Sequence, residues 1–235
     1  MRFAVAVLFL FLAARPAFAD FAAAQRALEG RRFEGAFAAC KVEAAAGGAA
    51  CQNLLGYLYA EGLGVPRRPV RAVRLFRRAA AQGYLAAEDN LGRAYELGVG
   101  VGKDAATAAL WYGKAAARKY PKAQNHLAIL YAEGKGVARD PRRAEALFRR
   151  AALSGFAPAA FNLGLALEEG RGVPRDLVGA YIWLSIAARP SSPPSLRAKA
   201  AVAARRVGER LPARKRADAR ARALSWRPGQ GDPLL

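Results

Sequence analysis

The chain is poor in the residues that most often carry chemistry. Among 235 residues there is one histidine, His126, and there are two cysteines, Cys40 and Cys51. A zinc site usually needs three or four such ligands close together, so a metal is not expected. No serine or cysteine has a histidine at a readable spacing, and no paired carboxylates stand out. We therefore expect no catalytic residue, no cofactor and no metal.

Long apolar runs are also absent, apart from one near the start of the chain. Arg2 precedes a twelve-residue apolar run from Phe3 to Ala14, and Ala17-Phe18-Ala19 follows it. A basic start, a short apolar stretch and small residues before a cleavage point form a secretory signal peptide. Twelve residues are too few to cross a bilayer, which takes about 20. We predict a signal peptide over residues 1–19 and a periplasmic or secreted mature chain; an uncleaved anchor is the alternative.

Acidic residues are scarce beside basic ones. There are 38 Lys and Arg against 18 Asp and Glu, a net charge of +20, and removal of Arg2 and Arg15 with the signal leaves +18 (20 − 2). Such a charge suggests nucleic acid as a partner, but export argues against it. The remaining interpretations are a solvated basic face, or attraction to an anionic envelope component such as an acidic protein, a polysaccharide or a lipid headgroup.

A motif recurs four times in the middle of the chain. Each copy has Leu followed by Gly or Ala, and then a Gly-x-Gly-Val turn seven residues after the Leu. The leucines are Leu55, Leu91, Leu127 and Leu163, so every step is 36 residues without an insertion. A fixed period of 20–50 residues is typical of a solenoid, and the alanine-rich composition favours helix over strand.

Each repeat is predicted to hold two helices, A and B. In the third repeat, Leu127 and Tyr131 are apolar at helical spacing, Gly134 and Gly136 break the helix, and Asp140-Pro141 opens the next. Small residues recur where the two helices must approach, and larger side chains recur as the filling. The small set is Gly56, Gly92, Ala128 and Gly164 on helix A; the large set is Phe76, Tyr112, Phe148 and Leu184 on helix B.

This pattern resembles the Sel-one-like repeat, a relative of the tetratricopeptide repeat. The resemblance implies an all-α fold, a right-handed α/α superhelical solenoid of helix-turn-helix units. Repeats are expected over residues 49–84, 85–120, 121–156 and 157–192. The resemblance also implies a scaffold for protein–protein interaction, since family members commonly act as adaptors. Several bacterial members work in the periplasm.

The two ends are expected to cap the array. Residues 20–48 resemble an N-terminal half-repeat, and residues 193–226 resemble the basic terminal helices of related bacterial proteins. Two helices are expected there, at about 195–210 and 213–226. Ala200, Val207 and Leu211 give the first an apolar side, and Ala217, Ala221, Leu224 and Trp226 give the second one. Residues 227–235 are expected to be disordered.

The two cysteines lie at a seam between hairpins. Cys40 has the register of Phe76 on helix B, and Cys51 begins the next helix A. An even number of cysteines in an oxidising compartment suggests a disulfide, worth about 3 kcal/mol for a loop of this size. Two free thiols or half of a metal site are the alternatives. Cysteine-rich relatives of the family place disulfides at this seam, with a shorter spacing.

One column of the repeat carries polar side chains. It holds Leu54, with Asn53 beside it, and then Asn90, His126 and Asn162; one helical turn further lie Tyr57, Arg93 and Ile129. In tetratricopeptide relatives this column lines the concave groove, where Asn side chains bind extended peptides. The resemblance thus implies a peptide site at Asn53, Tyr57, Asn90, Arg93, His126 and Asn162. Hydrogen bonds between repeats are the alternative interpretation.

Helix B of the first repeat carries a basic stripe, Arg71, Arg74 and Arg78, at spacings i, i+3 and i+7. A solvated convex face is one explanation of it, and a docking surface for an anionic partner is the other.

The functional hypothesis is an exported scaffold that holds a protein or peptide, as an adaptor or regulator in the bacterial cell envelope. The resemblance allows an alternative of a different class, because some family members are described as acting on penicillins or cell-wall peptides. The third possibility is a structural envelope protein that binds an anionic polymer.

Overall fold

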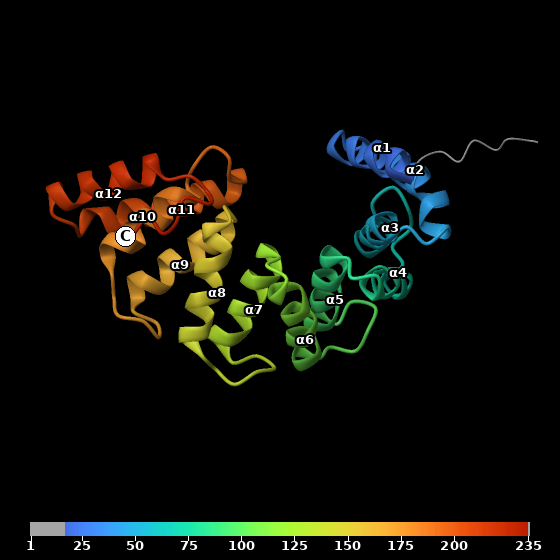
Figure 1. The fold of residues 1–235 in the computed structure, drawn as a ribbon, viewed down its shortest axis with the longest axis horizontal. Coiled ribbons are helices and arrows are strands. Elements are labelled where there is room, and N and C mark those ends of the chain that lie inside the picture. Colours follow the sequence, from blue (N-terminus) through green and yellow to red (C-terminus); the bar gives the residue numbers. More distant parts are fainter. Residues whose placement is uncertain (1–16, 235) are drawn as a thin grey trace, which may run out of the picture. The chain divides into compact units, whose positions relative to one another are not determined.

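The computed structural model describes residues 17–234, and the predicted signal peptide therefore lies largely outside the described residues. Within that range the chain forms twelve α-helices and no strand (Figure 1). None of the described helices is both long and apolar enough to cross a bilayer. Their bounds are α1 Ala17–Glu29, α2 Phe33–Ala45, α3 Ala49–Glu61, α4 Pro69–Ala81, α5 Leu85–Leu97, α6 Ala105–Ala117, α7 Pro121–Glu133, α8 Pro141–Leu153, α9 Ala157–Glu169, α10 Leu177–Ala187, α11 Pro194–Glu209 and α12 Ala213–Ser225.

The helices gather into two compact units, residues 1–79 and 80–235. In the first unit, α1 packs on α2 and α2 on α3 around a core that includes Cys40, Cys51 and Leu58. In the second, each helix from α5 to α10 packs on the next, and Tyr112, Leu130 and Trp183 are fully buried. Each helix pair leaves apolar surface that its neighbour covers, as expected of stacked repeats.

Close helix approach inside each pair requires the small residues of helix A. A Cβ atom added to Gly92 would lie 2.5 Å from the Tyr112 ring, and one added to Gly164 would lie 2.6 Å from Leu184. In the first unit, Gly56 stands in the same relation to Phe76, also at 2.6 Å. The predicted pairing of small and large columns is confirmed.

The second glycine of each turn has a different role from the first. Gly134 takes the left-handed conformation that ends α7, with φ of 71°, and its N–H bonds the carbonyl of Leu130. Gly136, also left-handed, lies against the start of α6 in the preceding repeat, where a Cβ would come within 2.2 Å of the Ala105 carbonyl carbon. This turn therefore both ends a helix and seats one repeat on another.

Helix B begins at an aspartate in three repeats. Asp104 accepts from the N–H groups of Ala106 and Thr107, while Asp140 and Asp176 each accept from the N–H three residues on. These bonds satisfy donors that the first turn of a helix leaves open. The predicted cap positions are confirmed.

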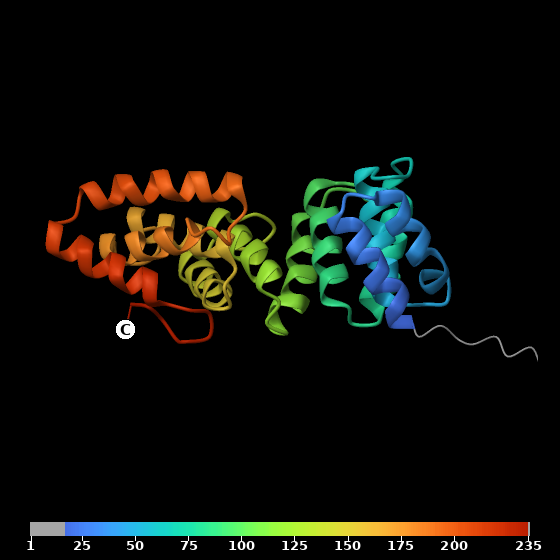
Figure 2. The same cartoon turned by 90° about the horizontal axis from the view of Figure 1, so that it is seen from above.

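Both terminal helices pack against α10 (Figure 2). Glu168, at the end of α9, is buried and forms ion pairs with Arg206 of α11 at 2.6 Å and with Arg210 at 3.1 Å. These contacts join the last repeat to the cap, and two of the cap arginines share the one negative charge of Glu168.

The apolar side predicted for α11 is correct, whereas that predicted for the second helix is correct only at Trp226. Ala200, Val207 and Leu211 are buried. On α12 the buried residues are Ala219 and Ala223, and Trp226 directly after the helix is buried too, whereas Ala217, Ala221 and Leu224 face solvent. The Trp226 ring packs edge-on against the Trp183 ring, with 5.6 Å between their centres. This contact sets the rotation of α12, so that Ala217, Ala221 and Leu224 lie on its exposed side.

Residues 227–234, for which disorder is expected from the sequence, fold back toward α8 in the structure. Asp232 forms an ion pair with Arg149 of α8, and the Gly229 N–H bonds the Leu153 carbonyl at 3.2 Å. The Trp226 indole N–H donates to the carbonyl of Gly231 at 2.8 Å. Proline and glycine in this segment allow the chain to fold back, and these specific contacts hold it there.

Candidate functional site

Polar side chains on successive A helices bond to one another from repeat to repeat. Nδ1 of His126 on α7 lies 2.7 Å from Oδ1 of Asp89 on α5, and Asn162 on α9 donates to Asn125 on α7 at 2.9 Å. Both pairs join residues 37 positions apart. We call these two pairs the inter-repeat ladder. It uses two residues of the predicted peptide site in the way that the alternative interpretation describes.

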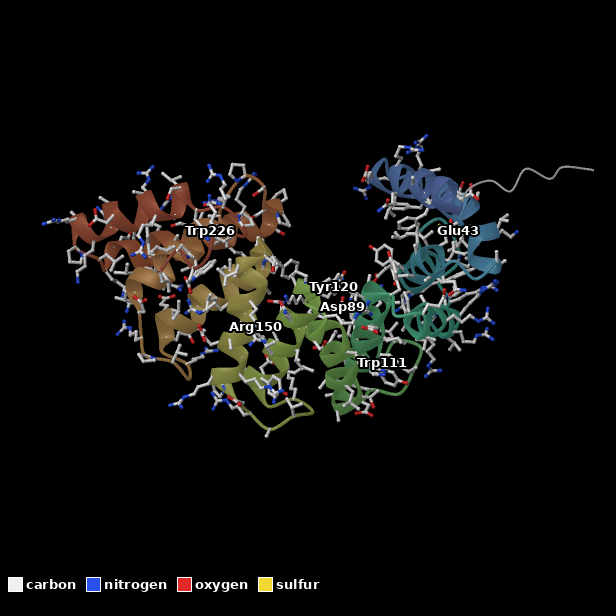
Figure 3. All side chains as sticks on the ribbon, in the orientation of Figure 1. Glu43, Asp89, Trp111, Tyr120, Arg150 and Trp226 are labelled. Carbon is white, nitrogen blue, oxygen red and sulfur yellow. A yellow bond between two sulfur atoms is a disulfide. The ribbon has the colours of Figure 1, made fainter. Side chains whose placement is uncertain are left out.

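Asp89 is the most deeply enclosed member of this ladder. Its side chain is 0% exposed, and Figure 3 labels it on α5. Besides His126, it meets the Lys122 ammonium, 3.1 Å from its second oxygen. A buried carboxylate without such partners would be very costly, so His126 and Lys122 compensate for its burial.

An aromatic residue of α6, Tyr112, packs against the His126 ring. The Tyr112 ring lies 4.9 Å from the His126 ring, and its hydroxyl donates to Glu96 at 2.7 Å. Burial raises the pKa of the Tyr112 phenol well above its ordinary value, and the hydrogen bond to Glu96 adds to this. The tyrosine therefore acts as a neutral donor and packing group.

A hollow opens between the third and fourth repeats. Ile129 of α7 and Leu165 of α9 supply apolar surface, with Ala132 and Ala166 beside them, and Asn162 brings an amide to the same hollow. Charged side chains of both signs complete it, namely Glu133, Arg139, Glu145, Glu169 and Arg171. We call this feature the α7–α9 hollow. Apolar surface with a few polar groups around it is the usual make-up of a binding site.

The predicted site residues occupy different surroundings. Asn162 borders the α7–α9 hollow, and His126 lies in the ladder with 23% of its side chain exposed. Asn90 is half-buried on α5, with Arg93 exposed one turn on. In the first unit Asn53 and Tyr57 are half-buried on α3. Peptide binding by these residues stays a prediction.

The basic stripe on α4 is exposed, and Arg71 within it makes a contact inside its own repeat. The Arg71 guanidinium lies 4.7 Å from the centre of the Tyr59 ring, and Arg143 lies 4.5 Å from that of Tyr131 two repeats later. These cation–π contacts join helix B to helix A within a repeat. Arg74 and Arg78 line a small concavity with Arg71 and Leu75.

The cysteine prediction is confirmed. Cys40 of α2 and Cys51 of α3 form a disulfide, with 5.0 Å between their Cα atoms. Both residues are fully buried, and Oε2 of Glu43 lies 3.3 Å from the sulfur of Cys51. Burial, with the nearby Asp20 carboxylate, raises the pKa of Glu43. Among the described residues no three His, Cys, Asp or Glu side chains are placed to hold a metal ion.

Sequence reasoning missed the acceptors of the ladder and the anchor of the cap. Asp89 and Asn125 occupy the column directly before the one singled out, and their 37-residue spacing to His126 and Asn162 was the available signal. Nothing in the sequence marked Glu168 as the partner of Arg206 and Arg210, because that contact depends on how α11 folds back.

The Sel1 repeat model matches residues 49–84, 85–120, 121–156 and 157–189. The chain belongs to the Sel1 repeat family. Proteins of this family generally mediate protein–protein interaction, and its scaffold is generally non-catalytic. The all-α helical solenoid class predicted from the repeat is confirmed.

Two solved structures illustrate the family relationship. A Sel1 repeat protein from Oxalobacter formigenes is 34% identical, with a TM-score of 0.60 over 70% of this chain and 68% of that one. A protective antigen of uropathogenic Escherichia coli with an SLR fold, c5321, is 26% identical with a TM-score of 0.64. The match covers 82% of this chain but only 46% of the antigen. No curated protein matches the chain.

Proposed function

We propose that this Sel1 repeat protein is an exported scaffold that holds an extended segment of a partner protein in the α7–α9 hollow. The observation that carries the proposal is the composition of that hollow. Ile129 and Leu165 offer apolar contact from two adjacent A helices, and the Asn162 amide borders the same space. A peptide segment could bury an apolar side chain there and exchange backbone hydrogen bonds with the amide.

We propose that the protein works in the bacterial cell envelope. The signal-peptide pattern over residues 1–19 supports export. The Cys40–Cys51 disulfide supports an oxidising compartment, because cytosolic thiols are kept reduced. An adaptor or regulator in the periplasm or outside the cell fits both features.

Site-specific photocrosslinking tests the hollow directly. p-Benzoylphenylalanine would replace Leu165 in the hollow, and in a control chain it would replace Ala117, which is exposed at the end of α6. Expressed in bacteria, the first chain should give a discrete crosslinked protein and the second should not. Ile129→Glu should reduce that crosslink about tenfold, which corresponds to about 1.4 kcal/mol.

Equal crosslinking from Leu165 and Ala117 would contradict the proposal, as would a crosslink from Leu165 that Ile129→Glu leaves unchanged. Circular dichroism of each purified chain establishes that the substitutions leave the helices intact.

A further inference from the structure

The outer face of α12 carries an apolar stripe that no other described part of the chain covers. Leu224 is 64% exposed, and Ala217 and Ala221 are exposed on the same side of the helix. Together with Tyr181 of α10 they line a shallow groove, which we call the α12 groove. Its complete lining is Tyr181, Ala213, Arg216, Ala217, Arg220, Ala221 and Leu224. The outermost helix of a solenoid normally turns a polar face to water, so this stripe is unexpected.

Two cations line the same groove. Arg216 and Arg220 are spaced i, i+4, so they lie one above the other on the surface of the helix. The helix as a whole holds Arg214, Lys215, Arg216, Arg220 and Arg222 against a single acid, Asp218. On α11, by contrast, Arg206 is neutralised by Glu168. Arg216 donates one long hydrogen bond, of 3.4 Å, to the Gly208 carbonyl, but no ion pair joins a cation of α12 to an acid in the described part of the chain. The positive charge of these arginines is therefore not neutralised within the described residues.

The charge and the apolar stripe together select among anionic partners. A polyanionic polymer would use the arginines but has no apolar group for Leu224 and Tyr181. A bilayer surface would need several large apolar side chains for insertion, and this stripe has one leucine among alanines. An acidic amphipathic helix supplies both features, since its apolar residues can pack on the alanines while its carboxylates reach the guanidinium groups.

We propose that the α12 groove is a docking site for an acidic amphipathic helix of a partner protein. Alanines at 213, 217 and 221 allow a second helix to approach closely over about two turns. Leu224 and Tyr181 provide the larger apolar contacts. Arg216 and Arg220 pair with carboxylates spaced three or four residues apart on the partner. This site is separate from the α7–α9 hollow, so the two can bind different segments.

The test uses a synthetic probe and the full mature chain. The probe is a fluorescein-labelled, stapled helical peptide with leucines along one face and glutamates beside them. Fluorescence anisotropy at physiological salt measures its Kd. Arg216→Glu with Arg220→Glu should weaken binding at least about thirtyfold, and Leu224→Gln about tenfold. The matched control is Arg214→Glu with Lys215→Glu, an identical charge change on residues of α12 outside the groove, which should weaken binding less than about threefold.

Two further peptides and one vesicle preparation separate the alternatives. Replacing the probe's leucines by glutamine, with all glutamates kept, should abolish binding, and replacing its glutamates by lysine should do the same. Equal losses in the two charge-reversal variants would overturn the proposal, because diffuse charge would then explain the binding. Tight binding of the leucine-free peptide would also overturn it. So would phosphatidylglycerol vesicles that bind the chain through Arg216 and Arg220 while the probe does not.

Discussion

At the scale of single residues, the most informative group is the buried carboxylate of Asp89. Its two oxygens face His126 and Lys122, both of the following repeat, so the cost of burying it is offset by contacts between repeats. The equivalent pair two helices on, Asn125 and Asn162, is uncharged. The same position in the repeat therefore holds a carboxylate–imidazole pair once and an amide–amide pair once.

We expect His126→Ala to lower the free energy of unfolding by about 2 kcal/mol, because a buried acceptor loses a partner. In an Asp89→Asn background the same substitution should cost less than about 1 kcal/mol. Urea unfolding of the four chains gives the coupling between the two residues. Additive effects of the two substitutions would show that the His126–Asp89 contact contributes no stability of its own.

A second residue-scale prediction concerns Gly136. Gly136→Ala places a Cβ at a left-handed φ of 69° and within 2.2 Å of the Ala105 backbone, so the free energy of unfolding should fall by about 2 kcal/mol. Gly102→Ala is the control, because a Cβ there meets nothing within 4 Å and its φ is ordinary. Thermal melts of both variants decide the matter, and equal melting temperatures would refute the role given to the second turn glycine.

At the scale of elements, the helix pairs depend on links that differ along the chain. In the first unit a disulfide joins α2 to α3. In the second unit the inter-repeat ladder joins α5 to α7 and α7 to α9, and Glu168 with its two arginines joins α9 to the cap. Removing one link should therefore weaken one seam and leave the remaining helices formed.

We expect Cys51→Ser to destabilise the first unit by about 3 kcal/mol while the chain stays helical, since closure of this loop restricts the unfolded state. Circular dichroism melts measure the change. Reducing agent should lower the melting temperature of the natural chain and leave that of the variant unchanged. Alkylation of both cysteines in unreduced, exported protein would be incompatible with the bond.

At the scale of the whole molecule, the arginines that give the chain its positive charge serve different roles in different places. The basic residues behind the net charge of +20 do not all have the same surroundings. Some arginines pack on tyrosines or pair with Glu168, whereas those of α12 line an exposed groove. Composition alone does not distinguish these two uses of the same residue type.

The proposed export predicts where the mature chain begins. Protein recovered from the periplasm should begin at Asp20, because Ala17 and Ala19 provide the small residues that signal peptidase reads. N-terminal sequencing measures this, and Ala19→Phe should block the processing. Recovery of chains that begin at Met1, held in the membrane fraction, would instead indicate an uncleaved anchor.

Much of the fold follows from short-range rules that the sequence makes visible. The same local geometry recurs from repeat to repeat, so the sequence shows it directly. It is visible in the 36-residue period, in the aspartates at the helix caps and in the pairing of a small residue such as Gly92 with a large one such as Tyr112. The candidate site was predictable only in part. The sequence identified the polar column, and peptide binding there stays a prediction. His126 and Asn162 bond to the neighbouring A helix because Asp89 and Asn125 stand one column earlier in the adjacent repeat.

The sequence by itself determined the repeat and the two helices in each repeat, because both depend on spacing along the chain. It suggested the Cys40–Cys51 disulfide but left free thiols or half of a metal site open, and the structure shows the bond. The tertiary structure alone decided which side of α12 is buried and where the tail lies. An alanine-rich helix has similar faces all round, so its rotation is set by a distant contact, here Trp226 against Trp183. The same holds for residues 227–234, whose order rests on Arg149, 83 positions from Asp232.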